Sequence, residues 1–576
     1  MAKNPYTEPN GAHYLLKGIR AEGVDHAFLV PGYMVEPFLS AFDEAGITPT
    51  IACQEGGAAY MADGYARASL KFGVAMGIGG PGVSNMVTAV GAAYSDRSPV
   101  LVVAGNTPNN LEGVGSFQDS GPTGVDDRDL FLPLTCFTEV IPDKSLVGSF
   151  LRKAIKAMKG FENRPAFLSM PHDMQLTPME YDYDPIEIVE SPRILDTEAA
   201  AGVHDILANA THVSILAGNG AVWSEATEDL RAFANQYSIP VATTMRAKGV
   251  LPEDDPCSTG IYGVGGSLWA DQVVMGDADN NIIGPDVLLI LGATLNENNT
   301  HGWLPGFHEN KTIIRVDINP NNILGKEYDE HFVTGDIRTF LRWLQGNNDG
   351  YGENLNSSIT ARQNWLSTVK ETPYYDAIAD RTSDATPIKP ARAIAALREA
   401  APRDTVMVVD SGAHTFFTSH NWNSYAPNEF LLLTTTGPMG YGVAATIGAM
   451  RARPDQPHCV VVGDGSLLMH GLEIHTAARY KMPMVIVVIN NSALANVFLR
   501  TLKESKEAQV LSSLPTQDWA AFSKSLGGDG VVVEDPADLA EAYKKAFATK
   551  DKPFLVDVRC DKFTPTPNTA ESALPS

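Results

Sequence analysis

The sequence predicts an α/β protein made of three doubly wound parallel-sheet domains. Short aliphatic runs bounded by Gly, Pro or Asn alternate along the chain with longer Ala-rich amphipathic stretches. Runs of this kind are typical of strands buried on both faces of a parallel sheet, and the amphipathic stretches are typical of helices that cover those faces. A chain of 576 residues is also long enough for three or four domains.

The expected strands occur throughout the chain, at residues 27–30, 99–104, 213–217, 287–291, 312–316, 459–462 and 484–489. The Ala-rich stretch at residues 391–400 illustrates the helix pattern between them. Two connectors are expected. One is acidic and contains proline, at residues 181–192, and the other is rich in Gly and Asn at residues 346–354 and continues as a polar stretch to about Pro387. They define three expected domains: an N-terminal domain over residues 1–185, a central Rossmann-like domain over 192–346 and a C-terminal domain over 375–565.

The composition narrows the classes of function. Lys and Arg number 43 and Asp and Glu 68, and the resulting net charge of −25 argues against nucleic acid or an anionic membrane as a partner. The five cysteines form no C-x-x-C pair, so we expect buried free thiols in a reducing compartment. The N-terminus shows no secretory signal and no apolar stretch reaches about 18 residues, so we expect a cytoplasmic protein.

Two motifs that follow neighbouring expected strands predict a metal site. Gly463-Asp464-Gly465-Ser466 comes directly after residues 459–462, and Asn490-Asn491 ends the next strand. In parallel sheets, ligands gather at the carboxyl ends of the strands. Magnesium prefers oxygen ligands, which Asp464, Asn491 and the backbone carbonyl of Ala493 could supply. A second Gly-Asp-Gly at residues 528–530 has no Asn-Asn pair after it and predicts a turn.

This order of motifs resembles the cofactor motif of thiamine diphosphate enzymes, specifically the acetolactate synthase/pyruvate oxidase/benzoylformate decarboxylase group. Residues 54–67 (QEGGAAYMADGYAR) resemble the family's glutamate segment, and residues 80–85 (GPGVSN) and 95–99 (SDRSP) follow it as in the family. The resemblance covers nearly the whole chain. It implies thiamine diphosphate and Mg²⁺ as cofactors, with a pyrimidine-binding N-terminal domain and a diphosphate-binding C-terminal domain. It also implies a homodimer or homotetramer with active sites at the subunit interface.

The resemblance also implies roles for individual residues. Glu55 matches the glutamate that bonds the pyrimidine ring, and Gln118 matches a glutamine that contacts bound intermediates. Residues 437–442 (GPMGYG) resemble the stretch that supports the bent cofactor, with Met439 as an apolar wedge and the Gly437 carbonyl as an acceptor.

A second set of residues is implied to lie near the diphosphate. Gly412 and His414 follow the expected strand that ends at Val409, with His414 as a phosphate donor. Gly465 allows the backbone to approach the phosphates, and Ser466 contacts them.

The reaction is less sharply defined by the sequence. The resemblance places Tyr33, Met34, Phe117, Val497 and Phe498 near the reacting carbon. Acetolactate synthases have a tryptophan where this chain has residues 495–499 (ANVFL), and their usual histidine before the glutamate is Gln54 here. We expect an acetolactate synthase-like enzyme that forms or cleaves a C–C bond beside a carbonyl, with a 2-oxo acid, aldehyde or acyl-thioester substrate.

Three alternatives stay open. One is a lyase or decarboxylase of the same family, including a 2-hydroxyacyl-CoA lyase. Another is a nicotinamide dehydrogenase, disfavoured because no clean G-x-G-x-x-G follows a strand. The third is a non-catalytic cofactor-binding homologue. In the central domain, residues 291–299 (LGATLNENN) lack the arginines that hold flavin adenine dinucleotide in acetolactate synthase, so FAD is possible but disfavoured, and an ADP or coenzyme A moiety is equally open.

Overall fold

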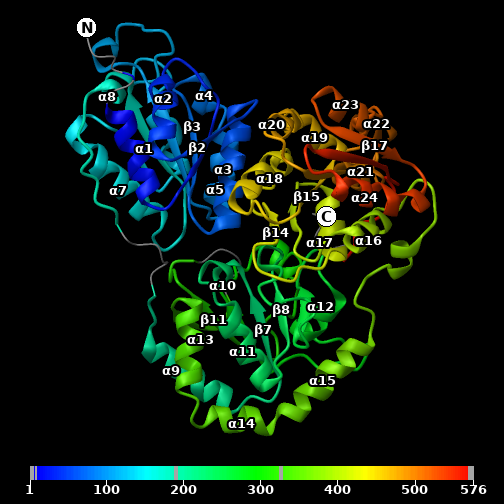
Figure 1. The fold of residues 1–576 in the computed structure, drawn as a ribbon. Coiled ribbons are helices and arrows are strands. Elements are labelled where there is room, and N and C mark those ends of the chain that lie inside the picture. Colours follow the sequence, from blue (N-terminus) through cyan, green and yellow to red (C-terminus); the bar gives the residue numbers. More distant parts are fainter. Residues whose placement is uncertain (1–5, 7–8, 187–192, 323–327, 569–576) are drawn as a thin grey trace.

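The structure is a computed structural model, and it describes residue 6 and residues 9–186, 193–322 and 328–568. Within these ranges the chain forms three six-stranded sheets in which every strand pairing is parallel. The N-terminal and C-terminal domains lie side by side, and the central domain lies against the C-terminal one (Figure 1). The predicted α/β class with three parallel-sheet domains is therefore confirmed.

The N-terminal sheet has the strand order β2-β1-β3-β4-β6-β5. Its strands are β1 (His26–Leu29), β2 (Thr48–Ile51), β3 (Gly73–Ile78), β4 (Val100–Asn106), β5 (Phe137–Val140) and β6 (Ala166–Pro171). Its helices are α1 (Gly11–Ala21), α2 (Glu36–Ala45), α3 (Glu55–Ser69), α4 (Pro81–Ser84), α5 (Val87–Ser95), α6 (Asp127–Phe131), α7 (Val147–Met158) and α8 (His172–Leu176). Every residue of β4 is buried, as expected for a strand covered on both faces.

The central sheet has the strand order β12-β11-β10-β7-β8-β9. Its strands are β7 (Val213–Ala217), β8 (Val241–Thr243), β9 (Ser258–Ile261), β10 (Val287–Leu291), β11 (Thr312–Asp317) and β12 (Glu330–Thr334). Its helices are α9 (Thr197–Ala208), α10 (Asn219–Trp223), α11 (Thr227–Tyr237), α12 (Leu268–Met275), α13 (Ile337–Gly346), α14 (Tyr351–Ser357) and α15 (Ile359–Glu371).

The two expected connectors have different outcomes. Part of the first, residues 187–192, lies outside the described residues. The second, at residues 346–354, differs from the expectation because α14 begins within it. Tyr351 and Leu355 are four residues apart, so they share one helix face, and both are buried against the central core. Burial of these two apolar side chains stabilises the helix despite the low helix propensity of the surrounding Gly and Asn residues.

The C-terminal sheet has the strand order β14-β13-β15-β16-β18-β17. Its strands are β13 (Val406–Val409), β14 (Phe430–Leu432), β15 (His458–Gly463), β16 (Met484–Asn490), β17 (Asp529–Val533) and β18 (Phe554–Arg559). Its helices are α16 (Pro390–Ala400), α17 (Ala413–Asn421), α18 (Tyr441–Ala452), α19 (Asp464–His470), α20 (Glu473–Arg479), α21 (Ala495–Thr501), α22 (Lys506–Leu511), α23 (Trp519–Ser525) and α24 (Leu539–Ala548). Residues 528–530, which predict a turn, instead lead into the edge strand β17.

Helices α3 and α18 join the N-terminal and C-terminal domains (Figure 1). Gly64 of α3 faces the Ala445 carbonyl of α18, and Gly448 of α18 faces the Met61 carbonyl of α3. A Cβ at either glycine would overlap the facing carbonyl oxygen, so only glycine permits this close approach. The two domains consequently share one continuous hydrophobic core.

Two expectations about the whole chain can be compared with the structure. All five cysteines are free. Cys257, Cys459 and Cys560 are buried as expected, but Cys53 and Cys136 are exposed, so the expectation of burial is wrong for these two. Among the helices of the described ranges, none combines the length and the apolar character that crossing a membrane would require.

Candidate active site

Asp464 and Asn491 lie at the carboxyl ends of the neighbouring strands β15 and β16. The two strands pair in parallel with Gly463 opposite Ile489, which places the residues that follow them at one edge of the sheet. Asp464 is buried, and its Oδ1 accepts the Gly465 N–H at 3.0 Å. Burial raises the pKa of the Asp464 carboxyl to about 6, although several backbone N–H groups oppose the shift.

Two of the predicted metal ligands carry a buried side-chain oxygen atom that has no hydrogen-bond partner among the described residues. The atoms are Oδ2 of Asp464 and Oδ1 of Asn491. Buried acceptors of this kind are rare in folded proteins and are costly unless a donor or a cation satisfies them. The described residues hold no group of three or more His, Cys, Asp or Glu side chains suited to a metal. A cation here would therefore take one carboxylate, one amide oxygen and backbone or non-protein oxygens, a set that fits Mg²⁺.

A cavity of about 320 Å³ surrounds these two oxygen atoms. Nine of the predicted site residues line it: Gly412, His414, Gly437, Met439, Asp464, Gly465, Ser466, Asn491 and Ala493. They come from the loops and helix starts that follow β13, β14, β15 and β16. The structure therefore brings together residues from four strand ends of one parallel sheet, where ligand sites are expected.

One wall of this cavity is formed by His414, at the start of α17. Its side chain is buried, and its Nε2 has no hydrogen-bond partner among the described residues. Burial lowers the pKa of His414 to about 4, so the ring is neutral near pH 7. A Cβ on Gly463 would lie 2.9 Å from its Nδ1, so glycine at this position leaves space for the ring. Nearby, the Ser466 hydroxyl donates to the Ser411 carbonyl at 2.9 Å.

The segment that carries Met439 is held by a carboxylate to which the sequence analysis gave no role. Asp410, directly after β13, accepts the Gly440 N–H at 2.9 Å and the Gly442 N–H at 2.7 Å. Burial raises its pKa to about 6, and the N–H donors oppose that shift. A Cβ on Gly465 would lie 3.3 Å from the Met439 methyl group, so this side chain lies over the loop after β15.

Glu55 and Gln118 do not line this cavity in their own chain. Glu55 begins α3 and is half-buried, and its Oε2 accepts the Asn85 side-chain N–H at 2.9 Å. A Cβ on Gly82 would lie 3.6 Å from Glu55 Oε1, so the loop after β3 packs against this carboxylate. A Cβ on Gly80, in the same loop, would lie 4.0 Å from the backbone carbonyl oxygen of Gln118.

A second carboxylate missed by the sequence analysis anchors the start of α3. Glu473 of α20 is buried and accepts the backbone N–H groups of Cys53 at 3.1 Å and of Gln54 at 3.2 Å. These residues immediately precede Glu55. The C-terminal domain thus fixes the position of the segment before Glu55 through hydrogen bonds from backbone N–H groups to a carboxylate. Bonds of this kind leave no recognisable pattern in the sequence.

Asp127 supports the loop after β3 in the same way. It is buried, and its two carboxylate oxygens accept the Gly80 N–H at 3.2 and 3.0 Å. Burial raises the pKa of Asp127 to about 7, against the opposing effect of the Gly80 N–H. The native state therefore binds this proton more tightly than the unfolded chain, in which the pKa of an aspartate is about 3.9.

We expect the Asp127→Asn variant to be more stable than the wild type at pH 8. Because the folded-state pKa is raised, the contribution of Asp127 to stability is present below about pH 4 and is lost as the pH rises through about 7. Asn cannot ionise but can still accept from Gly80. The unfolding midpoint of the variant should exceed that of the wild type by about 2–4 °C at pH 8 and match it near pH 4. Asp129→Asn, on the exposed face of the same helix, is the control, and equal midpoints for Asp127→Asn at both pH values would contradict the expectation.

The residues expected near the reacting carbon are not gathered in one place. Val497 lines the cavity around Asp464 and Asn491 and is half-exposed, whereas Phe498 is buried and packs against Phe563. Tyr33, Met34 and Phe117 line a separate cavity of the N-terminal domain. Phe117 is 77% exposed, a high value for an aromatic side chain in a folded domain.

A further cavity of about 320 Å³ lies where the central domain meets the other two. Two arginines on its lining are paired with acidic residues. Arg97 forms an ion pair with Glu162 at 3.4 Å, and Arg246 lies 3.9 Å from the Asp96 carboxylate.

Family models match all three parts of the chain. The N-terminal TPP binding domain of thiamine pyrophosphate enzymes matches residues 9–124, their central domain matches residues 200–344, and their C-terminal TPP binding domain matches residues 410–558. Together the matches cover more than half of the chain. The chain belongs to the thiamine pyrophosphate enzyme family, in the acetolactate synthase and pyruvate oxidase group.

Curated relatives extend this similarity over almost the full length. A probable acetolactate synthase large subunit from Methanococcus aeolicus is 29% identical over 98% of this chain and 94% of its own length. The acetolactate synthase large subunit of Haemophilus influenzae is 26% identical over 96% and 95%. The isozyme 2 large subunit of Escherichia coli K12 is 26% identical over 96% of both chains. The protein is a thiamine diphosphate-dependent enzyme similar to acetolactate synthases.

Proposed function

We propose that this enzyme uses thiamine diphosphate and Mg²⁺ to form or cleave a C–C bond beside a carbonyl, in an acetolactate synthase-like decarboxylation and carboligation of 2-oxo acids. One observation carries the proposal. Buried oxygen atoms of Asp464 and Asn491, which find no hydrogen-bond partner in the described part of the chain, lie at adjacent strand ends inside the family's C-terminal domain. The names of the relatives support the acetolactate synthase-like reaction.

The residues present fit the cofactor and its metal. Asp464, Asn491 and the Ala493 carbonyl would hold Mg²⁺, which would compensate the negative charge of the diphosphate. Nε2 of His414 is buried and has no partner among the described residues, and in the tautomer that carries its proton there it would donate a hydrogen bond to a phosphate oxygen. The Ser466 hydroxyl could reorient to do the same. Gly412 and Gly465 would allow the phosphates to approach the backbone. This arrangement binds a dianionic group without a basic patch, in agreement with the net charge of −25.

Thiamine diphosphate supplies a nucleophilic carbon and an acceptor for the electron pair released when a C–C bond breaks. The chain would supply the proton transfers. Glu55 would share a proton with a ring nitrogen of the cofactor, which is general acid–base chemistry by a half-buried carboxylate. The Gly437 carbonyl would accept from the amino group of the same ring, Met439 would support the bend between the two rings, and Gln118 would contact the reacting group.

We further propose a homodimer or homotetramer with active sites at the subunit interface. Glu55 does not line the cavity of its own chain, which supports a site that Glu55 of a second chain completes. Three large apolar side chains on and after α19 support such an interface, since Leu468 is 61% exposed and Met469 and Leu472 are each 55% exposed. They follow Asp464 along the same helix and the turn after it.

Complementation between two inactive variants tests this assembly. Glu55→Gln and Asp464→Asn chains should each be inactive alone. Random mixed dimers should regain about a quarter of wild-type activity, because half of the dimers are mixed and each mixed dimer has one intact site. No recovery in mixed assemblies, verified by two different affinity tags, would place Glu55 and Asp464 of one chain in the same site.

The reaction itself is tested by identifying products by NMR from a panel of 2-oxo acids, aldehydes and 2-hydroxyacyl thioesters. We expect CO₂ release from a 2-oxo acid and a ligated hydroxyketone product, dependent on both thiamine diphosphate and Mg²⁺. Cleavage of a 2-hydroxyacyl thioester instead would reassign the enzyme as a lyase of the same family. Turnover without thiamine diphosphate would overturn the proposal.

Flavin adenine dinucleotide is disfavoured in this proposal. Two arginines line the cavity where the central domain meets the other two domains. Arg97 is paired with Glu162 and Arg246 with Asp96, so their charges are compensated within the protein. A pyrophosphate would have to compete with these carboxylates. The visible spectrum of the purified protein tests this point, because bound oxidised flavin would give its yellow absorbance.

A further inference from the structure

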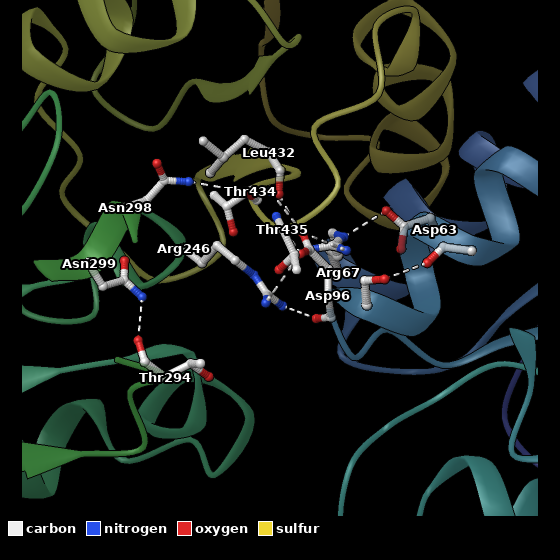
Figure 2. Close-up of polar contacts among 12 residues, drawn as sticks. Asp63, Arg67, Asp96, Arg246, Thr294, Asn298, Asn299, Leu432, Thr434 and Thr435 are labelled. Carbon is white, nitrogen blue, oxygen red and sulfur yellow. Dashed lines mark hydrogen bonds and ion pairs between the residues drawn. The ribbon is translucent and has the colours of Figure 1, made fainter. Parts of the chain in front are cut away.

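Asp96 lies buried where the three domains meet, directly after α5 (Figure 2). Its carboxylate accepts two backbone N–H groups of the C-terminal domain, from Thr434 at 3.0 Å and from Thr435 at 3.0 Å. These two residues follow β14 and lead into Gly437 and Met439. A side chain of the N-terminal domain thus holds the start of the segment 434–442, which is called the Met439 segment below.

Two arginines surround the same carboxylate. Arg67 of α3 lies 3.7 Å from Asp96, and Arg246 of the central domain lies 3.9 Å from it and also donates to the Asp96 backbone carbonyl. Burial favours the protonated acid, but Arg246, Arg67 and the two N–H donors outweigh it and hold the pKa of Asp96 below its usual range. The carboxylate is therefore charged in the folded protein near pH 7.

The Met439 segment has two further anchors. The side chain of Asn298, from the central domain, donates to the Thr434 carbonyl at 3.1 Å (Figure 2). At the other end, Asp410 holds Gly440 and Gly442. Buried carboxylates from two different domains thus fix the two ends of the segment, and Gly437 and Met439 lie between them.

The distances indicate what this carboxylate does. Both amide donors lie 3.0 Å away, closer than either guanidinium, so each carboxylate oxygen makes its short contact with the Met439 segment. A buried ion pair is by itself weak support for stability because desolvation offsets the attraction. The arginines compensate the charge, and the hydrogen bonds define the path of the backbone.

We propose that Asp96 is a positioning residue that fixes the Met439 segment relative to Asp464, at the carboxyl end of β15. Packing of the N-terminal domain against the C-terminal domain would then order Gly437 and Met439, the residues that support the cofactor. This inference rests on the proposed function. It assigns a role to Asp96 within residues 95–99, a segment that resembles the family but received no role from the sequence.

The test uses full-length enzyme loaded with thiamine diphosphate and Mg²⁺, with exchange of the cofactor C2 proton for deuterium as the readout. Asn at position 96 keeps one acceptor but loses the charge and places an NH₂ group against a backbone N–H. For Asp96→Asn we expect C2 exchange to fall about 10- to 100-fold, since misplacement of about 1 Å has effects of that size. The affinity for Mg²⁺ should stay within about threefold of the wild type, because Asp464 and Asn491 are untouched.

The matched control is Asp254→Asn. It removes an exposed ion pair with Arg403 at 2.7 Å that also joins the central and C-terminal domains but does not touch the Met439 segment. Its C2 exchange should equal that of the wild type. If Asp96→Asn does not fold, Asn298→Ala removes the neutral hydrogen bond to Thr434 and should lower exchange in the same direction, by a smaller factor.

A double-mutant cycle separates positioning from general destabilisation. If Asp96 acts through Met439, the effect of Asp96→Asn should shrink to less than about threefold in a Met439→Ala background. Unchanged exchange in Asp96→Asn, or fully additive effects in the cycle, would overturn the inference. Failure of the wild type to bind thiamine diphosphate or to exchange its C2 proton would instead overturn the proposed function.

Discussion

The Glu55→Gln variant is expected to bind thiamine diphosphate with nearly wild-type affinity but to lose C2 proton exchange and turnover by about 10²- to 10⁴-fold. Gln has the same shape and can still contact Asn85, which donates to the Glu55 carboxylate at 2.9 Å. It cannot hold and return a proton at the position of that carboxylate. The loss should therefore appear in the proton-transfer step rather than in binding.

Hydrogen–deuterium exchange at C2 of the bound cofactor measures that step directly, and calorimetry measures binding. Glu44→Gln is the control, because Glu44 is a half-exposed glutamate of the same domain that pairs with Lys17 at 2.6 Å. It should leave both measurements unchanged. Wild-type exchange in the Glu55→Gln variant would remove Glu55 from the proposed chemistry.

The Asp464→Asn variant should lose at least about 100-fold in Mg²⁺-dependent binding of thiamine diphosphate. Loss of outer-shell partners alone costs 10- to 100-fold in metal affinity, and Asp464 is proposed as the single carboxylate ligand. Asn keeps the size of the side chain and removes its negative charge. Titration calorimetry with Mg²⁺ at a fixed concentration of the cofactor measures the change.

The second Gly-Asp-Gly of the chain provides the matched control for this experiment. Asp529, at the start of β17, accepts the Gly530 N–H at 2.8 Å and lies near the surface beside Lys552. Asp529→Asn makes the same chemical change in the same local sequence, away from the cavity. Equal binding losses in both variants, or none in Asp464→Asn, would contradict the metal site.

Much of the fold could be predicted because its signals are local. The expected strand at residues 213–217 is β7, and the expected strand at 459–462 lies within β15 (His458–Gly463). Aliphatic runs between turn residues define buried parallel strands almost without tertiary information. The helix α14 was missed because its short apolar face is interrupted by Gly and Asn, and only packing against the central core stabilises it.

In the candidate site, too, the residues with a local sequence signal could be predicted and those that depend on tertiary contacts could not. Asp464 and Asn491 could be placed together because parallel strands end at one edge of their sheet. Asp96, Asp410 and Glu473 could not be assigned, because each accepts from backbone N–H groups, which any residue can supply. Asp96 and Thr434 are 338 positions apart, so no spacing rule connects them. The separation of Glu55 from the cavity around Asp464 likewise depends on how the domains of the chain pack together rather than on local pattern.

The contact between α3 and α18 has a consequence for anyone who engineers this enzyme. Replacing helix glycines with alanine is a common route to thermostability and gains about 0.5–1 kcal/mol at ordinary positions. At Gly64 and Gly448 the added methyl group would meet a carbonyl oxygen of the facing helix and force the two helices apart. A consensus or helix-propensity redesign should leave these two glycines in place, because the spacing they set is also the spacing between the two domains.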